Sequence, residues 1–118
     1  EVVRQARALD DILVVSYHFG EEYETQSRKR QRELAHAAVD AGATIVIGHH
    51  PHVVQEIEEY SGGFIAYSLG NFIFDQAFSP QTKEGLMLRM YKEGGAIVKV
   101  EPITLSFNEF YEPVPKKP

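Results

Sequence analysis

The chain has 118 residues, of which 43% are hydrophobic and 25% are charged, and its formal net charge is −5. This length supports one domain with a real core, and the negative charge argues against a nucleic-acid partner. The absence of cysteine excludes disulfides, thiolate zinc sites and a cysteine nucleophile. No apolar run reaches the roughly 18 residues of a membrane span, and the sequence has no signal-peptide pattern.

The first residues have the pattern of a helix end. The chain begins at Glu1 without a methionine, and residues 1–9 place apolar side chains on one side of a helix. No helix start precedes them. We therefore expect a piece of a longer protein, in which any signal or anchor would lie outside this sequence.

The next segments predict a strand, a helix and a second strand. Residues 12–16 form an apolar run that is typical of a strand covered on both faces. A helix is expected to begin near Thr25 to Ser27, either of which can cap it, and to end at Gly42. Residues 44–48 are the second apolar run. The short connections predict a βαβ unit whose strands are parallel.

Antiparallel hairpins are expected in the second half. The predicted strand pairs are residues 53–60 with 64–69, and residues 84–91 with 96–107. Residues 72–75 are expected to continue the sheet as a short apolar piece. The expected class is therefore α/β (α+β), a βαβ unit followed by antiparallel hairpins, with a domain over residues 1–112 and a flexible tail over 113–118. Such a thin core needs further strands from missing sequence or a partner chain, and it leaves a homo-oligomer open.

Histidines gather where the two predicted parallel strands end. His18 follows the first strand, and His50 and His52 follow the second with a rigid proline between them. The carboxyl ends of parallel strands share one sheet edge, and neighbouring strands lie about 4.8 Å apart. We therefore expect these imidazoles to share a transition-metal site, with His49 as a further candidate. The alternative at each position is a packed or solvated histidine.

The charged residues of the predicted helix are expected to have structural or surface roles and not to bind metal. His36 lies in the middle of the predicted helix, which favours a surface or packing role. Arg28, Lys29, Arg30 and Arg32 lie near the start of that helix. They predict a solvated face or, alternatively, a patch for an anionic polymer.

Three blocks of sequence carry a family resemblance. Residues 18–23 are His-Phe-Gly-Glu-Glu-Tyr, residues 48–55 are Gly-His-His-Pro-His-Val-Val-Gln, and residues 67–72 are Tyr-Ser-Leu-Gly-Asn-Phe. In this order they resemble the CapA-type poly-γ-glutamate capsule biosynthesis proteins, which look like a branch of the calcineurin-like metallophosphoesterases. The resemblance covers about residues 10–76. Phe19 departs from it, because the family commonly has tryptophan there.

The resemblance implies a fold and a site. The chain would be the C-terminal portion of a metallophosphoesterase-like β-sandwich with flanking helices. His18, His50 and His52 would bind divalent metal, with His49 on a variable position of the motif. Two ions are implied in the whole protein, as manganese, zinc or iron. Asn71 in the third block and Asp75 shortly after it are two candidate catalytic residues, which would line the pocket or hydrogen-bond to ligands. The alternative for these two is a turn residue and a strand-end residue.

The family plan places the remaining ligands in an amino-terminal half, and no such motif precedes His18. The resemblance therefore implies metal-dependent hydrolase or transferase chemistry in a whole protein that is extracytoplasmic or membrane-associated. Its substrate would be phosphate-containing or a poly-γ-glutamate-related anion. This chain alone should bind metal weakly and be inactive. Two alternatives stay open: a non-catalytic protein that binds or exports an anionic polymer with a degenerate metal site, and a fragment whose histidines do no chemistry.

Overall fold

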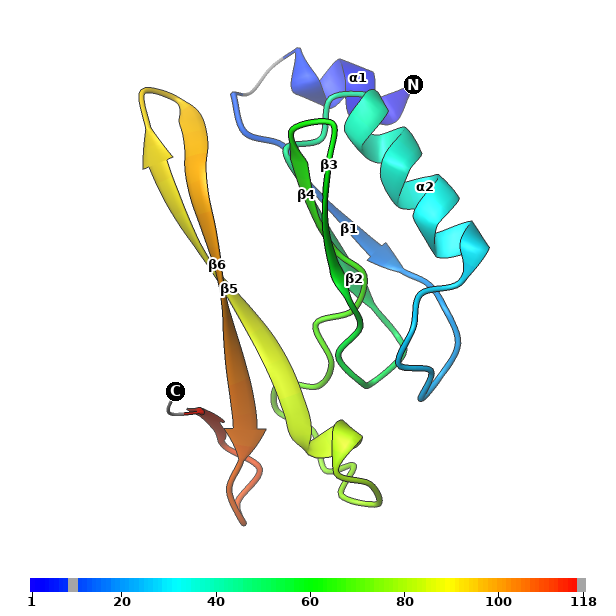
Figure 1. The fold of residues 1–118 in the computed structure, drawn as a ribbon, viewed down its shortest axis with the longest axis vertical. Coiled ribbons are helices and arrows are strands. Elements are labelled where there is room, and N and C mark those ends of the chain that lie inside the picture. Colours follow the sequence, from blue (N-terminus) through cyan, green and yellow to red (C-terminus); the bar gives the residue numbers. More distant parts are fainter. Residues whose placement is uncertain (9–10, 117–118) are drawn as a thin grey trace.

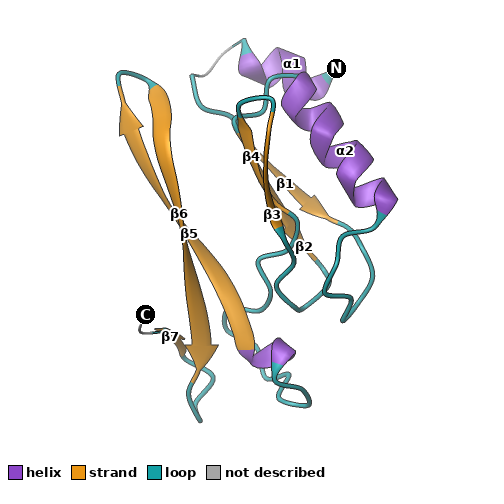
Figure 2. Cartoon of the chain, in the orientation of Figure 1, coloured by secondary structure: helices purple, strands orange, loops and turns teal. Residues whose placement is uncertain are grey.

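The protein is described by a computed structural model that covers residues 1–8 and 11–116. Two helices lie on one face of a central sheet, and a long hairpin lies on its other face (Figure 1, Figure 2). The elements in chain order are α1 (Val2–Arg7), β1 (Val14–His18), α2 (Lys29–Asp40), β2 (Ile45–His49), β3 (Ile57–Tyr60), β4 (Gly63–Ala66), the 3₁₀ turn η1 (Gln81–Lys83), β5 (Glu84–Glu93), β6 (Ala96–Phe107) and β7 (Pro113–Pro115).

The sheet topology confirms the predicted α+β class. In the described part of the chain, one sheet has the strand order β1-β2-β4-β3 and the other has the order β5-β6-β7. β1 pairs with β2 in parallel, as the βαβ prediction requires. β4 pairs with β2 in parallel and with β3 in antiparallel orientation. The carboxyl ends of β1, β2 and β4 therefore lie at one edge of the first sheet.

The core lies between α2 and the first sheet. Ala35 and Ala38 of the helix are buried against Val46, Ile65 and Tyr67. Small helical side chains let the helix approach the sheet closely, and Val46 and Ile65 are both 0% exposed as a result. Burial of one such aliphatic side chain contributes about 1.5–3 kcal/mol. This packing fixes β2, and with it the histidine-rich turn that follows.

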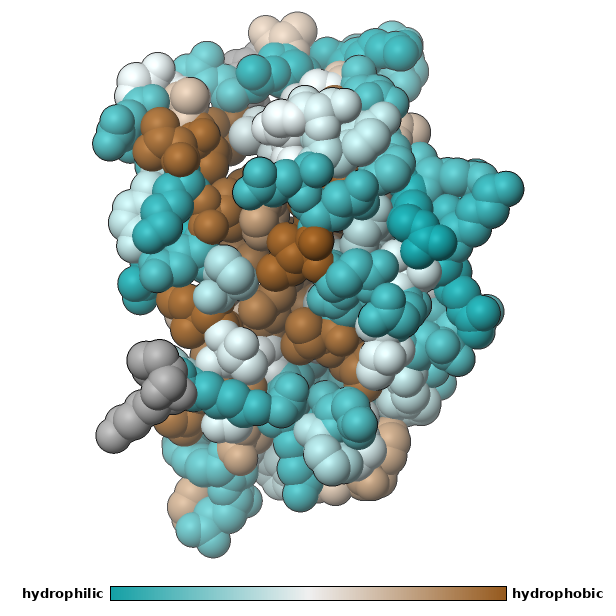
Figure 3. All heavy atoms as spheres, viewed as in Figure 1, coloured by the Kyte–Doolittle hydropathy of each residue, from teal (hydrophilic) through white to brown (hydrophobic). Residues whose placement is uncertain are grey.

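The opposite face of the first sheet is less completely covered. A cavity of about 400 Å³ separates this face from the second sheet, and Val14, Ile47, Leu86 and Leu88 are among its lining residues. Hydrophobic side chains reach the surface between the β5–β6 hairpin and the first sheet (Figure 3). β1 and β5 are the edge strands of their sheets on the side of this cavity. Within the described residues β1 pairs only with β2, so its outer edge can accept a further strand. β5 is already engaged at its start, where Gly85 bridges Gly70 and the N–H of Leu86 donates to the carbonyl of Leu69.

The first correction concerns the start of α2. We expected a cap between Thr25 and Ser27, but the helix begins at Lys29 and Arg28 is the N-cap residue. The backbone N–H of Ser27 donates to Glu56 at 3.0 Å, and its hydroxyl donates to the same carboxylate. The side chain of Gln31 instead accepts from the N–H of Arg28 at 2.8 Å. Ser27 is thus held by a tertiary contact that competes with capping.

The second half differs from the predicted hairpins in two places. Residues 72–75 form a loop and not a strand, and residues 53–55 lie outside β3. Gly70 explains the first difference, because its positive φ of 68° turns the chain out of the sheet. Buried Gln55 explains the second, because its side chain bonds to Gln31 and to the carbonyl of Glu24 and ties this segment to neighbouring loops.

The expected flexible tail, residues 113–118, begins instead with a strand. β7 pairs with β6, and the N–H of Lys116 donates to the carbonyl of Thr104 at 2.8 Å. Residues 117 and 118 lie outside the described part, as do residues 9 and 10 at the end of the first predicted helix. None of the helices described is long and apolar enough to span a bilayer.

Candidate metal centre

The histidine-rich turn begins where β2 ends. β2 closes at His49, and His50 and His52 then adopt left-handed backbone conformations, with φ of 101° and 60°. Such conformations cost about 1–3 kcal/mol each and persist where neighbours hold them. The loop after β1 supplies these restraints. The N–H of Phe19 donates to the carbonyl of His49 at 3.0 Å, and the N–H of Tyr23 donates to the carbonyl of Pro51 at 2.8 Å.

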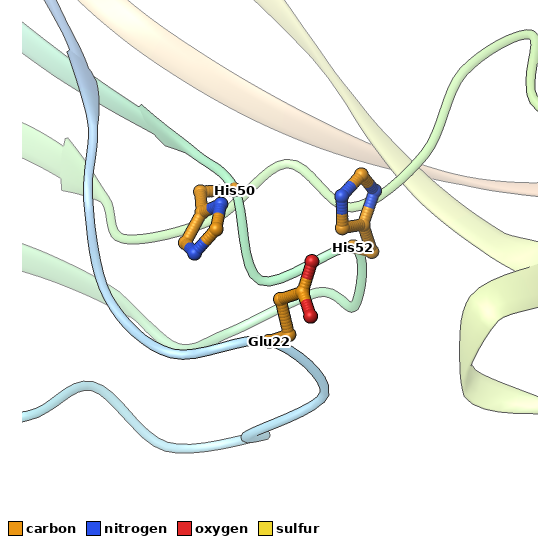
Figure 4. Close-up of side chains that lie close together, drawn as sticks. All are labelled: Glu22, His50 and His52. Atoms are coloured by element: carbon orange, nitrogen blue, oxygen red, sulfur yellow. The ribbon is translucent and has the colours of Figure 1, made fainter.

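These restraints bring three donors together. Glu22, His50 and His52 each place one ligand atom within 4.8 Å of the others (Figure 4). The two histidines are half-buried and the glutamate is exposed. His18, the last residue of β1, is exposed, and its ring centroid lies 4.8 Å from that of His50. The structure thus brings three of the predicted histidines to one sheet edge and adds a carboxylate.

Aromatic rings and a buried amide border His52. Its ring centroid lies 5.2 Å from Phe74 and 6.2 Å from Tyr23. Its Nδ1 lies 2.9 Å from Oδ1 of Asn71. Asn71 therefore lies next to His52, a candidate metal ligand. From the sequence, we expected Asn71 to line the pocket or to hydrogen-bond to ligands. The rings of Phe74 and Tyr23 limit the access of water to His52 on their sides.

His49 and Asp75 do not join the three-donor group in the described part of the chain. His49 is half-buried and lines the cavity between the two sheets. Burial lowers the pKa of His49, and the nearby charge of His18 lowers it further. Both effects favour the neutral form of His49. Asp75 is exposed in the loop after β4.

Sequence reasoning missed Glu22 as a donor. The residue lies in an acidic loop with Glu21 and Glu24, and no spacing rule selects one of these carboxylates. In the structure, Arg28 lies 3.0 Å from Glu21 and 3.2 Å from Glu24. Glu22 lies instead beside His50 and His52. The sequence signal that could have selected Glu22 is its position in the first of the three family blocks.

The basic residues around the start of α2 lie beside carboxylates. Besides the two contacts of Arg28, Lys29 and Arg30 lie 3.7 and 3.4 Å from Glu33, and Arg32 lies 3.9 Å from Glu56. Neighbouring acids on this face offset its positive charge. The face therefore offers a mixed-charge surface and not a purely cationic patch for an anionic polymer.

His36 lies in a separate polar cluster on the helix side of the sheet. Its Nε2 lies 3.0 Å from Glu58, and its ring stacks on Tyr60 with a centroid separation of 3.8 Å. Tyr67 donates its hydroxyl hydrogen to the same carboxylate at 2.6 Å. This hydrogen bond is the main cause that lowers the pKa of Glu58, although partial burial opposes it. His36 thus has the packing role that its mid-helix position favoured.

Comparison with known proteins shows which family the chain resembles. The chain is 43% identical over 106 residues to the PGA biosynthesis protein CapA of Bacillus subtilis, and the match covers 88% of the chain and 28% of that relative. It is 46% identical over 97 residues to the capsule biosynthesis protein CapA of Bacillus anthracis, covering 80% of the chain and 23% of the relative. The chain thus spans less than a third of the length of these relatives.

A third relative is more distant. A probable polyglutamine synthesis accessory protein of Mycobacterium tuberculosis is 35% identical over 65 residues, which are 55% of the chain and 17% of that protein. Residues 1–76 match the family model described as bacterial capsule synthesis protein PGA_cap. These residues include β1, α2, β2 and the whole cluster of candidate donors. The chain belongs to the PGA_cap family of bacterial capsule synthesis proteins.

Proposed function

We propose that this chain carries part of a divalent metal site of the metallophosphoesterase type, in a hydrolase or transferase that acts in poly-γ-glutamate capsule assembly. The observation that carries the proposal is the group formed by Glu22, His50 and His52, with His18 beside it. The group lies beyond the carboxyl ends of parallel strands, where open α/β sheets place their sites. The names of the two Bacillus relatives support the cellular role.

The donor set fits a divalent transition metal. Two imidazoles and a carboxylate suit zinc, manganese and iron. A bound ion would supply Lewis-acid chemistry, which lowers the pKa of water and offsets charge on a phosphate oxygen. In this proposal His50 and His52 act as neutral donors, and Glu22 adds a negative charge. Tyr23 and Phe74 shield one side of His52 from bulk water.

The open edge of β1 indicates where further ligands would enter. β1 is an edge strand of its sheet, and Val14 on it is 42% exposed. A strand added parallel to β1 would end next to His18, about 4.8 Å away. We propose that an amino-terminal part of the same protein supplies this strand and the missing ligands. This part would complete the ligand set of a second ion and the walls of a pocket for an anionic substrate.

The test uses the whole protein that contains this chain. After dialysis against Mn²⁺ or Zn²⁺, the metal content is measured by mass spectrometry, and phosphodiester hydrolysis is assayed with bis(p-nitrophenyl) phosphate. We expect His50→Ala to lose at least one equivalent of metal and most of the activity. His36→Ala is the matched control, because His36 pairs with Glu58 on the helix side of the sheet, and it should keep both. Equal metal content and activity in His50→Ala and wild type would refute the proposal.

A further inference from the structure

We infer that Asn71 is a positioning residue that fixes the tautomer of His52, so that Nε2 of this imidazole is the metal-binding nitrogen. The inference rests on the proposed metal site and adds a role for a residue that does not bind the ion. It starts from the hydrogen bond between Nδ1 of His52 and Oδ1 of Asn71, whose length is 2.9 Å. A ring nitrogen can donate or accept in such a contact, so the direction must come from the surroundings.

The surroundings of Asn71 set this direction. Asn71 is 5% exposed, and its Nδ2 donates to the backbone carbonyl of Thr82 at 3.0 Å. A carbonyl oxygen accepts hydrogen bonds and does not donate them, so the amide NH₂ of Asn71 must face Thr82. Its Oδ1 must then face His52. Because this oxygen can only accept, the proton lies on Nδ1 of His52 and the lone pair lies on Nε2.

The backbone of Asn71 is also held in place. A Cβ added to Gly85 would lie 2.2 Å from the carbonyl oxygen of Asn71, so the two backbones touch. Thr82 is 0% exposed, its N–H donates to Oγ of Ser79, and its hydroxyl donates to the carbonyl of Ser79. The backbone that carries the Asn71 side chain and the turn that presents the carbonyl of Thr82 are thus both held in place.

The tautomer suits the donor group. With Nδ1 engaged by Asn71, Nε2 is the nitrogen of His52 that remains for a metal, and one ring nitrogen of His52 faces His50 and Glu22 (Figure 4). A hydrogen bond to the distal nitrogen orients a ligating imidazole and raises its basicity. Removal of such a partner typically lowers metal affinity about 10- to 100-fold.

The first experiment measures the tautomer directly. The whole protein is labelled with ¹⁵N-histidine, freed of metal, and held at a pH where the imidazole of His52 is neutral. Long-range ¹H–¹⁵N correlation spectra then report which ring nitrogen carries the proton. We expect the proton on Nδ1 in wild type. A proton on Nε2 in wild type would overturn the inference even if the protein binds metal, whereas a proton on Nδ1 without metal binding would overturn the proposed metal site alone.

Two variants separate positioning from a merely structural role. Asn71→Asp keeps an oxygen that accepts from His52, so it should keep the proton on Nδ1. Asn71→Leu keeps the branch at Cγ but has no acceptor, so it should move the proton toward Nε2 and weaken Mn²⁺ or Zn²⁺ binding about 10- to 100-fold. If Asn71→Leu leaves the tautomer and the affinity unchanged, the inference is wrong. If that variant does not fold, the wild-type spectrum and Asn71→Asp still decide the question.

Discussion

Gly48 offers the sharpest test of how the fold positions the candidate site. A Cβ built on this residue would lie 1.9 Å from the carbonyl oxygen of Tyr67 and 2.6 Å from Cε1 of Phe19. The first of these atoms belongs to the backbone of the segment that continues β4, and it cannot rotate away. Gly48→Ala should therefore push β2 away from this neighbour. The shift breaks the bond in which the N–H of Leu69 donates to the carbonyl of Gly48 at 3.1 Å.

The expected loss of stability in Gly48→Ala is the sum of two costs. Overpacking in a well-packed region costs about 1–3 kcal/mol, and loss of a backbone hydrogen bond costs about 1 kcal/mol. We expect Gly48→Ala to lower the free energy of unfolding by about 3 kcal/mol, measured by urea denaturation. Because His50 and His52 follow directly, the same variant should bind Mn²⁺ or Zn²⁺ at least about tenfold more weakly, as expected for misplaced ligands.

Gly94→Ala is the control for this prediction. A Cβ at Gly94 would meet no heavy atom within 4 Å, and the residue lies in the turn between β5 and β6 with φ of 53°. Its cost is therefore that of a left-handed conformation, about 1 kcal/mol, with metal affinity unchanged. Equal denaturation midpoints for the two variants would refute the close approach at Gly48.

Three further predictions concern the core and the polar cluster. Ile65→Ala should lower the free energy of unfolding by about 2–5 kcal/mol. Ile73→Ala is its control, because this side chain is 71% exposed, and it should change the free energy of unfolding by less than about 0.5 kcal/mol. Urea denaturation measures both changes. Tyr67→Phe removes a hydrogen bond to a carboxylate that is 34% exposed, so thermal denaturation should show a loss of about 1 kcal/mol. The pKa of Glu58 is lowered on folding, so its contribution to stability is present above its ordinary pKa of 4.5 and lost as the pH falls through the lowered value. Glu58→Gln should therefore flatten the decline of stability below about pH 4.5, and an unchanged acid profile would contradict this account.

The βαβ unit could be predicted because its signals are local. Two apolar runs flank an amphipathic helix, and both strands are found where these runs lie. The position of His18, His50 and His52 at a shared edge then follows from strand direction alone, and β1 and β2 are indeed parallel. Strand direction in a βαβ unit is set by its short connections, so the shared edge follows without any distant contact.

The failures have a common physical cause, which is competition from contacts between distant segments. Ser27 is a good capping residue by type, but Glu56 engages it across 29 positions of sequence. Phe72, Ile73 and Phe74 are apolar, but a local pattern does not show whether another segment covers them, and all three side chains are exposed. The role proposed for Asn71 depends on the carbonyl of Thr82, and a backbone carbonyl has no sequence signature.

The candidate site therefore depends on two kinds of restraint. The ends of β1 and β2 place His18 and the histidine-rich turn at one sheet edge. This placement can be inferred from sequence. Hydrogen bonds between loops then fix the conformation of this turn. The N–H of Tyr23 donates to the carbonyl of Pro51, which lies between the two histidines with left-handed backbones. Glu22 precedes Tyr23, so the same bond that fixes the turn also brings the carboxylate to the imidazoles. A change that loosens this loop should thus weaken all three donors together, whereas a change at one donor leaves the other two in place.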